Sequence, residues 1–215
     1  MPGRLFAETV IRCDPGMLWQ RTQDPAAHQR WDLRFTRIDY LPRTDPAQPQ
    51  RFRYAVRVLP GLTVSGTGST VARTGRVCAL RFGSAHPLSL IRSGAGYWRY
   101  LPGQDGIRFR TGYDYQPGWG RLGPVADRLF RPLLGWGTAW SFDRLRLWLE
   151  RGTTPETLLR NALLDAGSRV AACAIVAFEG SIAQAVIVAA VLLALPPLPT
   201  TPAARRCRRS TVERS

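Results

Sequence analysis

The chain contains no lysine: all 30 of its basic residues are arginine, set against 15 acidic residues. The formal net charge is therefore +15, and the isoelectric point is near 11.2. Such a surplus can indicate nucleic-acid binding, because clustered cations release counterions from phosphates. Here the arginines alternate with apolar residues, as at Arg51, Arg53 and Arg57, and abundant Ala, Gly and Pro indicate codon bias in a GC-rich genome. We therefore predict an arginine-covered solvent face and no nucleic-acid partner.

Cysteine and histidine are scarce. The four cysteines are scattered through the chain, which excludes a C-x-x-C pair or zinc cluster and fits a reducing compartment. Neither His28 nor His86 lies in a motif that supplies a nucleophile or an orienting acid, so we expect both on the surface.

Motifs for catalysis and phosphate binding are missing as well. The sequence has no H-E-x-x-H and no G-x-S-x-G, and the glycine-rich stretch 64–70 lacks both G-x-G-x-x-G and a Walker lysine. That stretch is more typical of a bend or bulge in a strand. Asp143 is expected to pair with Arg144 or Arg146 on a helix surface. We predict no catalytic residue, no metal site and no cofactor.

One long apolar run breaks this pattern. From Val170 to Leu195 the only charge is Glu179, and about 20 apolar residues suffice for a helix to span a bilayer. Prolines then stop the helix, and the arginines at 205–209 suit anionic headgroups. We predict a connecting helix over 153–169, a transmembrane or membrane-inserted segment over 170–198 and a basic, disordered tail over 199–215. The alternative is a buried core helix.

The orientation of this segment stays open. Glu8 and Asp14 precede any apolar run that could serve as a signal peptide, so we expect the N-terminal domain on the cytoplasmic side of the cell membrane. The excess of arginine after the segment weakly places the C-terminus in the cytosol too, which conflicts with a single span. A hairpin turning at Glu179 to Ser181 would keep both ends inside, although each arm is too short to cross.

Before residue 125 the periodicity is that of half-buried antiparallel strands, with apolar residues at every second position in 51–58 and 107–115. Shorter candidate strands are 6–12, 35–41, 62–73, 76–82 and 97–101. Asp14 with Pro15 and Asp24 with Pro25 begin two short helices. Helical spacing returns over 124–150, where Pro132, Gly135 and Gly137 are expected to bend or break the helix.

The order of strand, two short helices, about six strands and a long final helix predicts an α+β helix-grip fold, a curved antiparallel sheet around a long C-terminal helix, with a hydrophobic helix added. The stretch E-T-V-I-R-C-D-P-G-M-L-W, with Asp24, Pro25 and Trp31 after it, resembles the polyketide cyclase/dehydrase branch of the START-like (SRPBCC) superfamily. The resemblance covers roughly residues 5–150, which places the ligand-binding domain at 1–152. Residues 112–150 also resemble members fused to DoxX-like membrane helices, but the membrane part here is too short for such a bundle.

The resemblance implies a cavity between sheet and helix that holds a lipid, a polyketide or another apolar molecule. The inward positions that would line it are Tyr54, Val56, Trp98, Tyr100, Phe109, Tyr113, Tyr115 and Trp140, unless these side chains simply fill the core. We therefore predict a membrane-tethered binding or carrier protein whose partners are a hydrophobic small molecule and membrane lipid. The alternatives are a polyketide cyclase or aromatase, with Tyr113 or Arg110 assisting enolisation, and an adaptor that recruits acidic partners.

Overall fold

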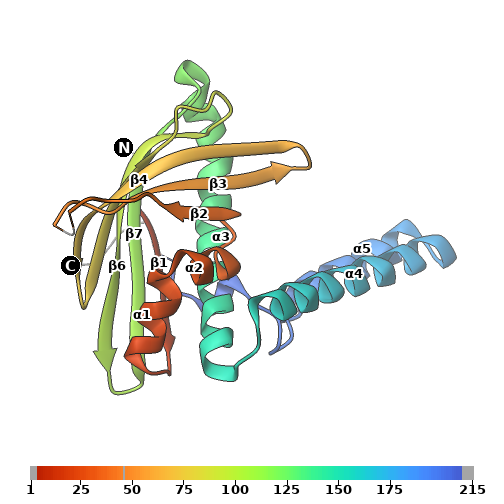
Figure 1. Ribbon diagram of the computed structural model, residues 1–215. Coiled ribbons are helices and arrows are strands. Elements are labelled where there is room, and N and C mark those ends of the chain that lie inside the picture. Colours follow the sequence, from red (N-terminus) through yellow and green to blue (C-terminus); the bar gives the residue numbers. More distant parts are fainter. Residues whose placement is uncertain (1–3, 46, 210–215) are drawn as a thin grey trace.

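A computed structural model describes residues 4–45 and 47–209 and contains one antiparallel sheet of seven strands in the order β1-β7-β6-β5-β4-β3-β2 (Figure 1). The strands are β1 (Leu5–Ile11), β2 (Arg37–Tyr40), β3 (Arg51–Leu59), β4 (Leu62–Thr74), β5 (Val77–Gly83), β6 (Ile91–Gly103) and β7 (Gly106–Pro117). The predicted seven strands are therefore present. The first strand of the chain, β1, pairs with the last, β7, so the two ends of the domain's strand sequence lie side by side in the sheet.

Strand β6 is longer than the predicted 97–101, since it begins at Ile91. Its first half contains glycines, which have poor strand propensity. Neighbouring side chains occupy the space above them: a Cβ on Gly94 would lie 2.6 Å from the ring of Phe82, and one on Gly96 2.6 Å from Cβ of Tyr113. The glycines thus let side chains of β5 and β7 cross the sheet surface, and pairing on both edges keeps the strand extended.

Two short helices, α1 (Pro15–Gln23) and α2 (Pro25–Trp31), begin as predicted. The Asp14 carboxylate accepts a hydrogen bond from the Met17 amide at 3.0 Å, and Asp24 accepts one from the Ala26 amide at 3.0 Å. Each helix has proline in its first turn, where the missing N–H has no intrahelical partner to lose.

Helix α3 (Gly123–Arg151) follows the short 3₁₀ turn η1 (Gly120–Leu122) and lies along the concave face of the sheet (Figure 1). Of the two outcomes expected at Pro132 and its neighbouring glycines, a bend or a break, the break is wrong, because the helix is continuous. Packing outweighs propensity: Phe142, Leu145 and Leu147 are fully buried in its C-terminal half. With a sheet gripping one long helix, the helix-grip fold class is confirmed.

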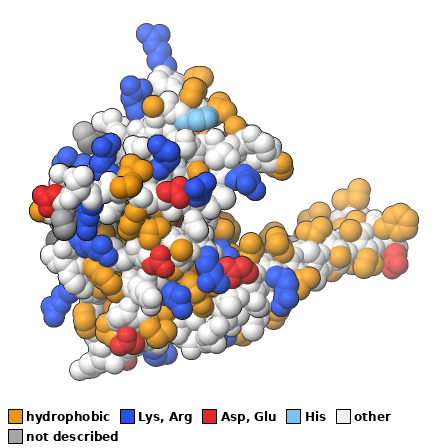
Figure 2. Space-filling view, in the orientation of Figure 1, with side chains coloured by type: hydrophobic (Ala, Val, Ile, Leu, Met, Phe, Trp, Pro, Cys, Tyr) orange, Lys and Arg blue, Asp and Glu red, His pale blue; other side chains and the backbone are white. Residues whose placement is uncertain are grey.

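The apolar run after this domain forms a helical hairpin rather than one long helix. Helix α4 (Pro155–Glu179) begins at the Thr154 cap and runs through the expected connecting helix and the first half of the apolar run. The helix stops at Gly180, and Ser181 caps α5 (Ile182–Ala194) in a capping box with Gln184. Glu179 thus lies at the turn between the two helices, as in the hairpin alternative considered from the sequence. The hairpin projects from the domain and presents a mainly apolar surface (Figures 1 and 2).

The residues after α5 return to the domain. Thr201, Ala203, Ala204 and Cys207 are each under 10% exposed, around the 3₁₀ turn η2 (Ala204–Arg206). The prediction of a disordered tail is therefore wrong for residues 199–209, while residues 210–215 lie outside the described part of the chain. Asp143 was also misplaced on the helix surface: it is fully buried, and it accepts hydrogen bonds from this returning segment. Its partner on α3 is Arg146, as expected.

Candidate functional site

A cavity of about 420 Å³ lies between the sheet and the N-terminal half of α3. Strands β2 to β7, the loop after α2 and one face of α3 enclose it. Its wall is largely apolar, and the apolar side chains in it include Leu33, Phe35, Ile38, Phe52, Val56, Leu80, Phe82, Ile91, Trp98, Phe130, Leu133 and Leu134. Side chains of the sheet pack directly against the C-terminal half of α3. The cavity lies between the sheet and the N-terminal half of the helix.

Of the eight side chains predicted to line a cavity, four are in its wall: Tyr54, Val56, Trp98 and Tyr113. The other four are buried elsewhere. Phe109 stacks on Phe142 at 4.5 Å between ring centroids, in the closed part of the core. The Tyr100 hydroxyl bonds Thr22 and Gln23 on α1.

Tyr115 and Trp140 are the remaining two. The Tyr115 hydroxyl donates to Asp127, beside Arg131, and Trp140 stacks against Trp136 on α3. Strand alternation identifies the inward face of each strand and helical spacing that of α3, but neither gives the level at which sheet and helix separate. All eight side chains therefore looked equivalent in the sequence. Contact of any of them with a ligand stays a prediction.

A polar cluster at the cavity wall was not predicted. Asp32, at the end of α2, is 1% exposed, and its carboxylate accepts hydrogen bonds from Arg34 Nε at 2.9 Å and from the other side of the guanidinium at 2.6 Å. His28 Nε2 lies 3.0 Å from the same carboxylate. Since a carboxylate only accepts, His28 donates through Nε2–H. Both His28 and Arg34 face the cavity.

The expectation that His28 lies on the surface was therefore wrong. Its imidazole stacks on Trp31 at 5.0 Å and meets the edge of Trp98 at 4.8 Å. The i, i+4 spacing of His28 and Asp32 on one short helix was a visible signal for their pairing. Nothing local in the sequence indicated that both would be buried.

Burial and the charges within the cluster together set its charge states. Burial alone would raise the pKa of Asp32, but the Arg34 charge and the hydrogen bonds from His28 and Arg34 outweigh it and hold that pKa well below its usual range. Burial would lower the pKa of Arg34, and the Asp32 carboxylate reverses this and raises it. For His28 burial dominates over Asp32, so its pKa is lowered. The cluster is thus an ion pair, Asp32–Arg34, beside a neutral imidazole.

Tyr113 joins the ion pair to α3. Thr138 donates its hydroxyl proton to the Leu134 carbonyl, so at 2.7 Å it accepts from the Tyr113 hydroxyl. Arg34 lies beside Tyr113, with its guanidinium carbon 5.4 Å from the tyrosine ring centre. Burial raises the pKa of Tyr113. Arg110, the alternative to Tyr113 for assisting enolisation, pairs with Glu8 on β1 at 2.7 Å, and the arginine beside Tyr113 is Arg34.

The lowered pKa of His28 predicts a pH dependence of stability. The unfolded chain takes up a proton at His28 near its ordinary pKa of 6.5, whereas the folded chain does so only at lower pH. This contribution is therefore present above about pH 6.5 and is lost as pH falls toward the folded pKa. Denaturant unfolding between about pH 7.5 and about pH 5.5 should show a steeper loss of stability for the native chain than for His28→Gln, which keeps an N–H donor.

The matched control for that series is His86→Gln. His86 lies in the β5–β6 loop, where its ring nitrogen accepts from the Leu88 amide. We expect the His86→Gln slope to match that of the native chain; equal slopes for the native chain and His28→Gln would contradict a buried, neutral His28.

Within residues 4–45 and 47–209, no group of three or more His, Cys, Asp or Glu side chains is arranged to hold a metal ion. The same part of the chain has one helix, α4, that is long and apolar enough to cross a membrane by length and composition.

Comparisons with known proteins agree with this architecture. The chain is 48% identical over 167 residues to the uncharacterized membrane protein YndG of Bacillus subtilis (strain 168), a match that includes 74% of this chain. The chain spans 62% of the length of that relative. No family model matches the chain.

Among solved structures, the chain is similar to a START superfamily protein from Mycobacterium smegmatis, with a TM-score of 0.54 and 14% identity over 70% of this chain and 99% of that one. It is also similar to the di-domain ARO/CYC StfQ from the steffimycin biosynthetic pathway, with a TM-score of 0.55 and 12% identity over 69% of this chain and 50% of that one. At these identities the likeness shows the fold alone, a helix-grip fold like that of these two proteins.

Proposed function

We propose that the protein binds or carries an apolar small molecule, lipid or polyketide-like, in the cavity between sheet and α3, and that the α4–α5 hairpin tethers it to a membrane. The ligand domain ends near residue 152, where Gly152 caps α3 with a positive φ of 68°. The observation that carries the proposal is a largely apolar cavity of about 420 Å³ between the sheet and α3.

The cavity has the size and chemistry of a small-molecule site. Ligand pockets usually measure roughly 300–1,000 Å³ and combine apolar walls with a few placed polar groups. Here Arg34, Tyr113 and His28 are among the polar side chains that face the space. An amphiphile would direct its polar end toward them and its apolar part toward Phe52 and Leu80.

Support for the tether comes from the hairpin and from the relative. The apolar side chains of the hairpin are solvent-exposed, for example Phe178 at 94% and Leu193 at 83%. Exposed apolar surface of this extent marks an interaction site. The relative YndG carries the description of a membrane protein. We place the domain on the cytoplasmic side; the likeness of the segment to DoxX-like helices stays a prediction.

Charged substitutions in the hairpin provide the test. In Ile175→Asp combined with Val186→Asp, each carboxylate replaces a side chain that is at least 57% exposed, so the fold is unaffected while insertion becomes costly. After a carbonate wash, we expect the native chain in the membrane pellet and the double variant in the supernatant. Val71→Asp, on the exposed face of β4, should remain in the pellet. Release of the native chain by carbonate would contradict the proposed membrane tether.

A second candidate is a cyclase- or aromatase-like reaction on the bound molecule. It is favoured by one observation: the Arg34 guanidinium and the Tyr113 hydroxyl face the same cavity, and together they can polarise an enolisable carbonyl. Turnover of a polyketide-like substrate that disappears in Tyr113→Phe, while binding of that substrate persists, would establish it.

A further inference from the structure

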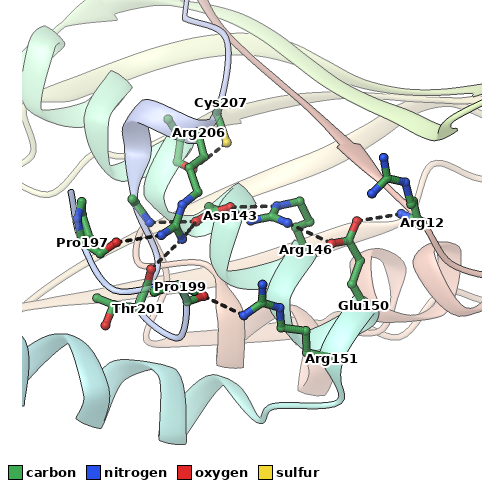
Figure 3. Close-up of polar contacts among 12 residues, drawn as sticks. Arg12, Asp143, Arg146, Glu150, Arg151, Pro197, Pro199, Thr201, Arg206 and Cys207 are labelled. Carbon is green, nitrogen blue, oxygen red and sulfur yellow. Dashed lines mark hydrogen bonds and ion pairs between the residues drawn. The ribbon is translucent and has the colours of Figure 1, made fainter.

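The segment that follows the hairpin is held to the domain by a buried carboxylate (Figure 3). Asp143 on α3 accepts from the Ala203 amide at 2.8 Å, from Arg206 at 3.0 Å and from Arg146 at 2.6 Å. Arg206 also donates to the carbonyls of Thr201 at 2.8 Å and Pro197 at 3.1 Å, which fixes the bend between α5 and η2. We call this group of contacts the Asp143 clamp.

Two further contacts extend the attachment beyond the Asp143 clamp. The backbone of Arg208 pairs with Glu8 on β1 through hydrogen bonds of 2.9 and 3.0 Å, so the segment adds to the edge of the sheet. The thiol of Cys207 is buried beside the Ala139 carbonyl at 3.2 Å, and burial raises its pKa to about 12. Since α4 also leaves the domain directly after α3, both ends of the hairpin start from the same domain.

The boundary between polar and apolar parts of the hairpin is fixed by Arg169. Its guanidinium pairs with Asp165 on α4 at 3.2 Å and donates to the carbonyls of Leu192 and Leu195 at the end of α5. On the domain side of Arg169, the chain from Pro196 to Thr200 is not helical and lies along α4. Asn161 donates there to the Thr200 carbonyl at 3.3 Å. Irregular backbone of this kind is not found exposed to lipid, so the bilayer surface lies near Arg169.

Helix α4 as a whole is long enough to cross a membrane, but its apolar part beyond Arg169 is short. The ten residues from Val170 to Glu179 rise about 15 Å at ~1.5 Å each, half of a hydrocarbon core of ~30 Å. Helix α5 has 13 residues, also too few to span.

Resting on the proposed membrane tether, we infer that the hairpin inserts from one side only: its tip ends within the bilayer, and both of its bases stay at the surface that carries the ligand domain. The partner is the leaflet adjacent to the domain. The Asp143 clamp holds the second base there, because a chain that crossed the bilayer at this hairpin could not bring Ala203 and Arg206 back to α3. The ligand cavity and the hairpin bases thus share one membrane surface.

Thiol labelling in sealed membrane vesicles of both orientations tests this topology on the full chain. Cys13 and Cys173 are replaced by alanine, while Cys78 and Cys207 are buried and remain. Single cysteines are then introduced by Gly75→Cys in the domain, Leu198→Cys at the base and Ile182→Cys at the tip. Gly75 has open space around it, and Leu198 and Ile182 are 56% and 80% exposed.

With an impermeant maleimide, we expect Gly75→Cys and Leu198→Cys to label in the same vesicle orientation and Ile182→Cys to label in neither until detergent is added. Tip labelling from the face opposite Gly75→Cys would overturn the inference, as would base labelling from that opposite face. A chain that is washed off the vesicles and labels at all three positions would instead overturn the tether itself, so the two failures are distinguishable.

Discussion

Gly137→Leu is expected to weaken binding of an apolar ligand at least tenfold while leaving the chain as stable as before or more so. Gly137 lies in the cavity wall on α3, and a Cβ placed there meets no atom within 4 Å. A leucine side chain at this position is therefore expected to extend into the cavity and to take up space that a ligand would need. Leucine also suits a helix interior better than glycine by about 0.8–1 kcal/mol.

The measurement is a titration with a fluorescent apolar probe, alongside thermal unfolding of the same samples. Gly167→Leu is the matched control, because Gly167 is also a helical glycine with no atom within 4 Å of an added Cβ, but it lies on α4, away from the cavity. We expect the control to bind the probe as the native chain does. Unchanged binding by Gly137→Leu would mean that the probe binds elsewhere.

Asp32→Ala is expected to destabilise the fold by about 3–5 kcal/mol, the range seen when one partner of a buried ion pair is removed. The Asp32 side chain is fully buried, and it bonds His28 and both sides of the Arg34 guanidinium. Without it, Arg34 is a charge in the core with 15% of its side chain exposed, beside the Tyr113 ring. Denaturant unfolding of the two chains gives the difference.

Two variants separate this effect from a general loss of an aspartate. Asp39→Ala removes an exposed pair with Arg37, whose side chains are 44% and 73% exposed, and should cost no more than about 1 kcal/mol. Asp32→Ala combined with Arg34→Met removes both charges and should recover part of the lost stability. A loss below about 1 kcal/mol in Asp32→Ala would show that Arg34 reaches water and that the cluster is not a buried ion pair.

The strands and their faces could be predicted from sequence because period-2 alternation directly reports a half-buried sheet. Tyr54 and Val56 on β3 and Tyr113 on β7 were assigned inward and do face the cavity. Phe109 was assigned to the same face and lies in the closed core instead. The distance between sheet and helix at each level depends on tertiary packing, and local periodicity carries no information about it.

The burial of polar groups was the second feature that could not be predicted from the sequence. His28, Asp32 and Asp143 are charged or polar residues that sequence reasoning places on the surface, since burial is costly without partners. Their partners, Arg34 for one cluster and Arg206 for the other, become adjacent only in the fold. The return of residues 201–208 to α3 and β1 was missed for the same reason: a basic, proline-containing stretch has the composition of a solvated tail.

The apolar segment shows what composition can and cannot resolve. Length and hydropathy identified 170–195 as unusual, and the interruption at Glu179 to Ser181 allowed both a single span and a hairpin. The capping box of Ser181 with Gln184 is the local feature that favours a new helix start, and it is present in the sequence as S-x-x-Q.

Native mass spectrometry of the full chain, extracted in mild detergent, is the sharpest test of a ligand in this cavity. We expect a population of the native chain that carries one additional apolar molecule, lost on collisional activation, and no such population for Gly137→Leu prepared in parallel. Only the bare mass in both preparations, or the same adduct in both, would contradict a ligand held between the sheet and α3.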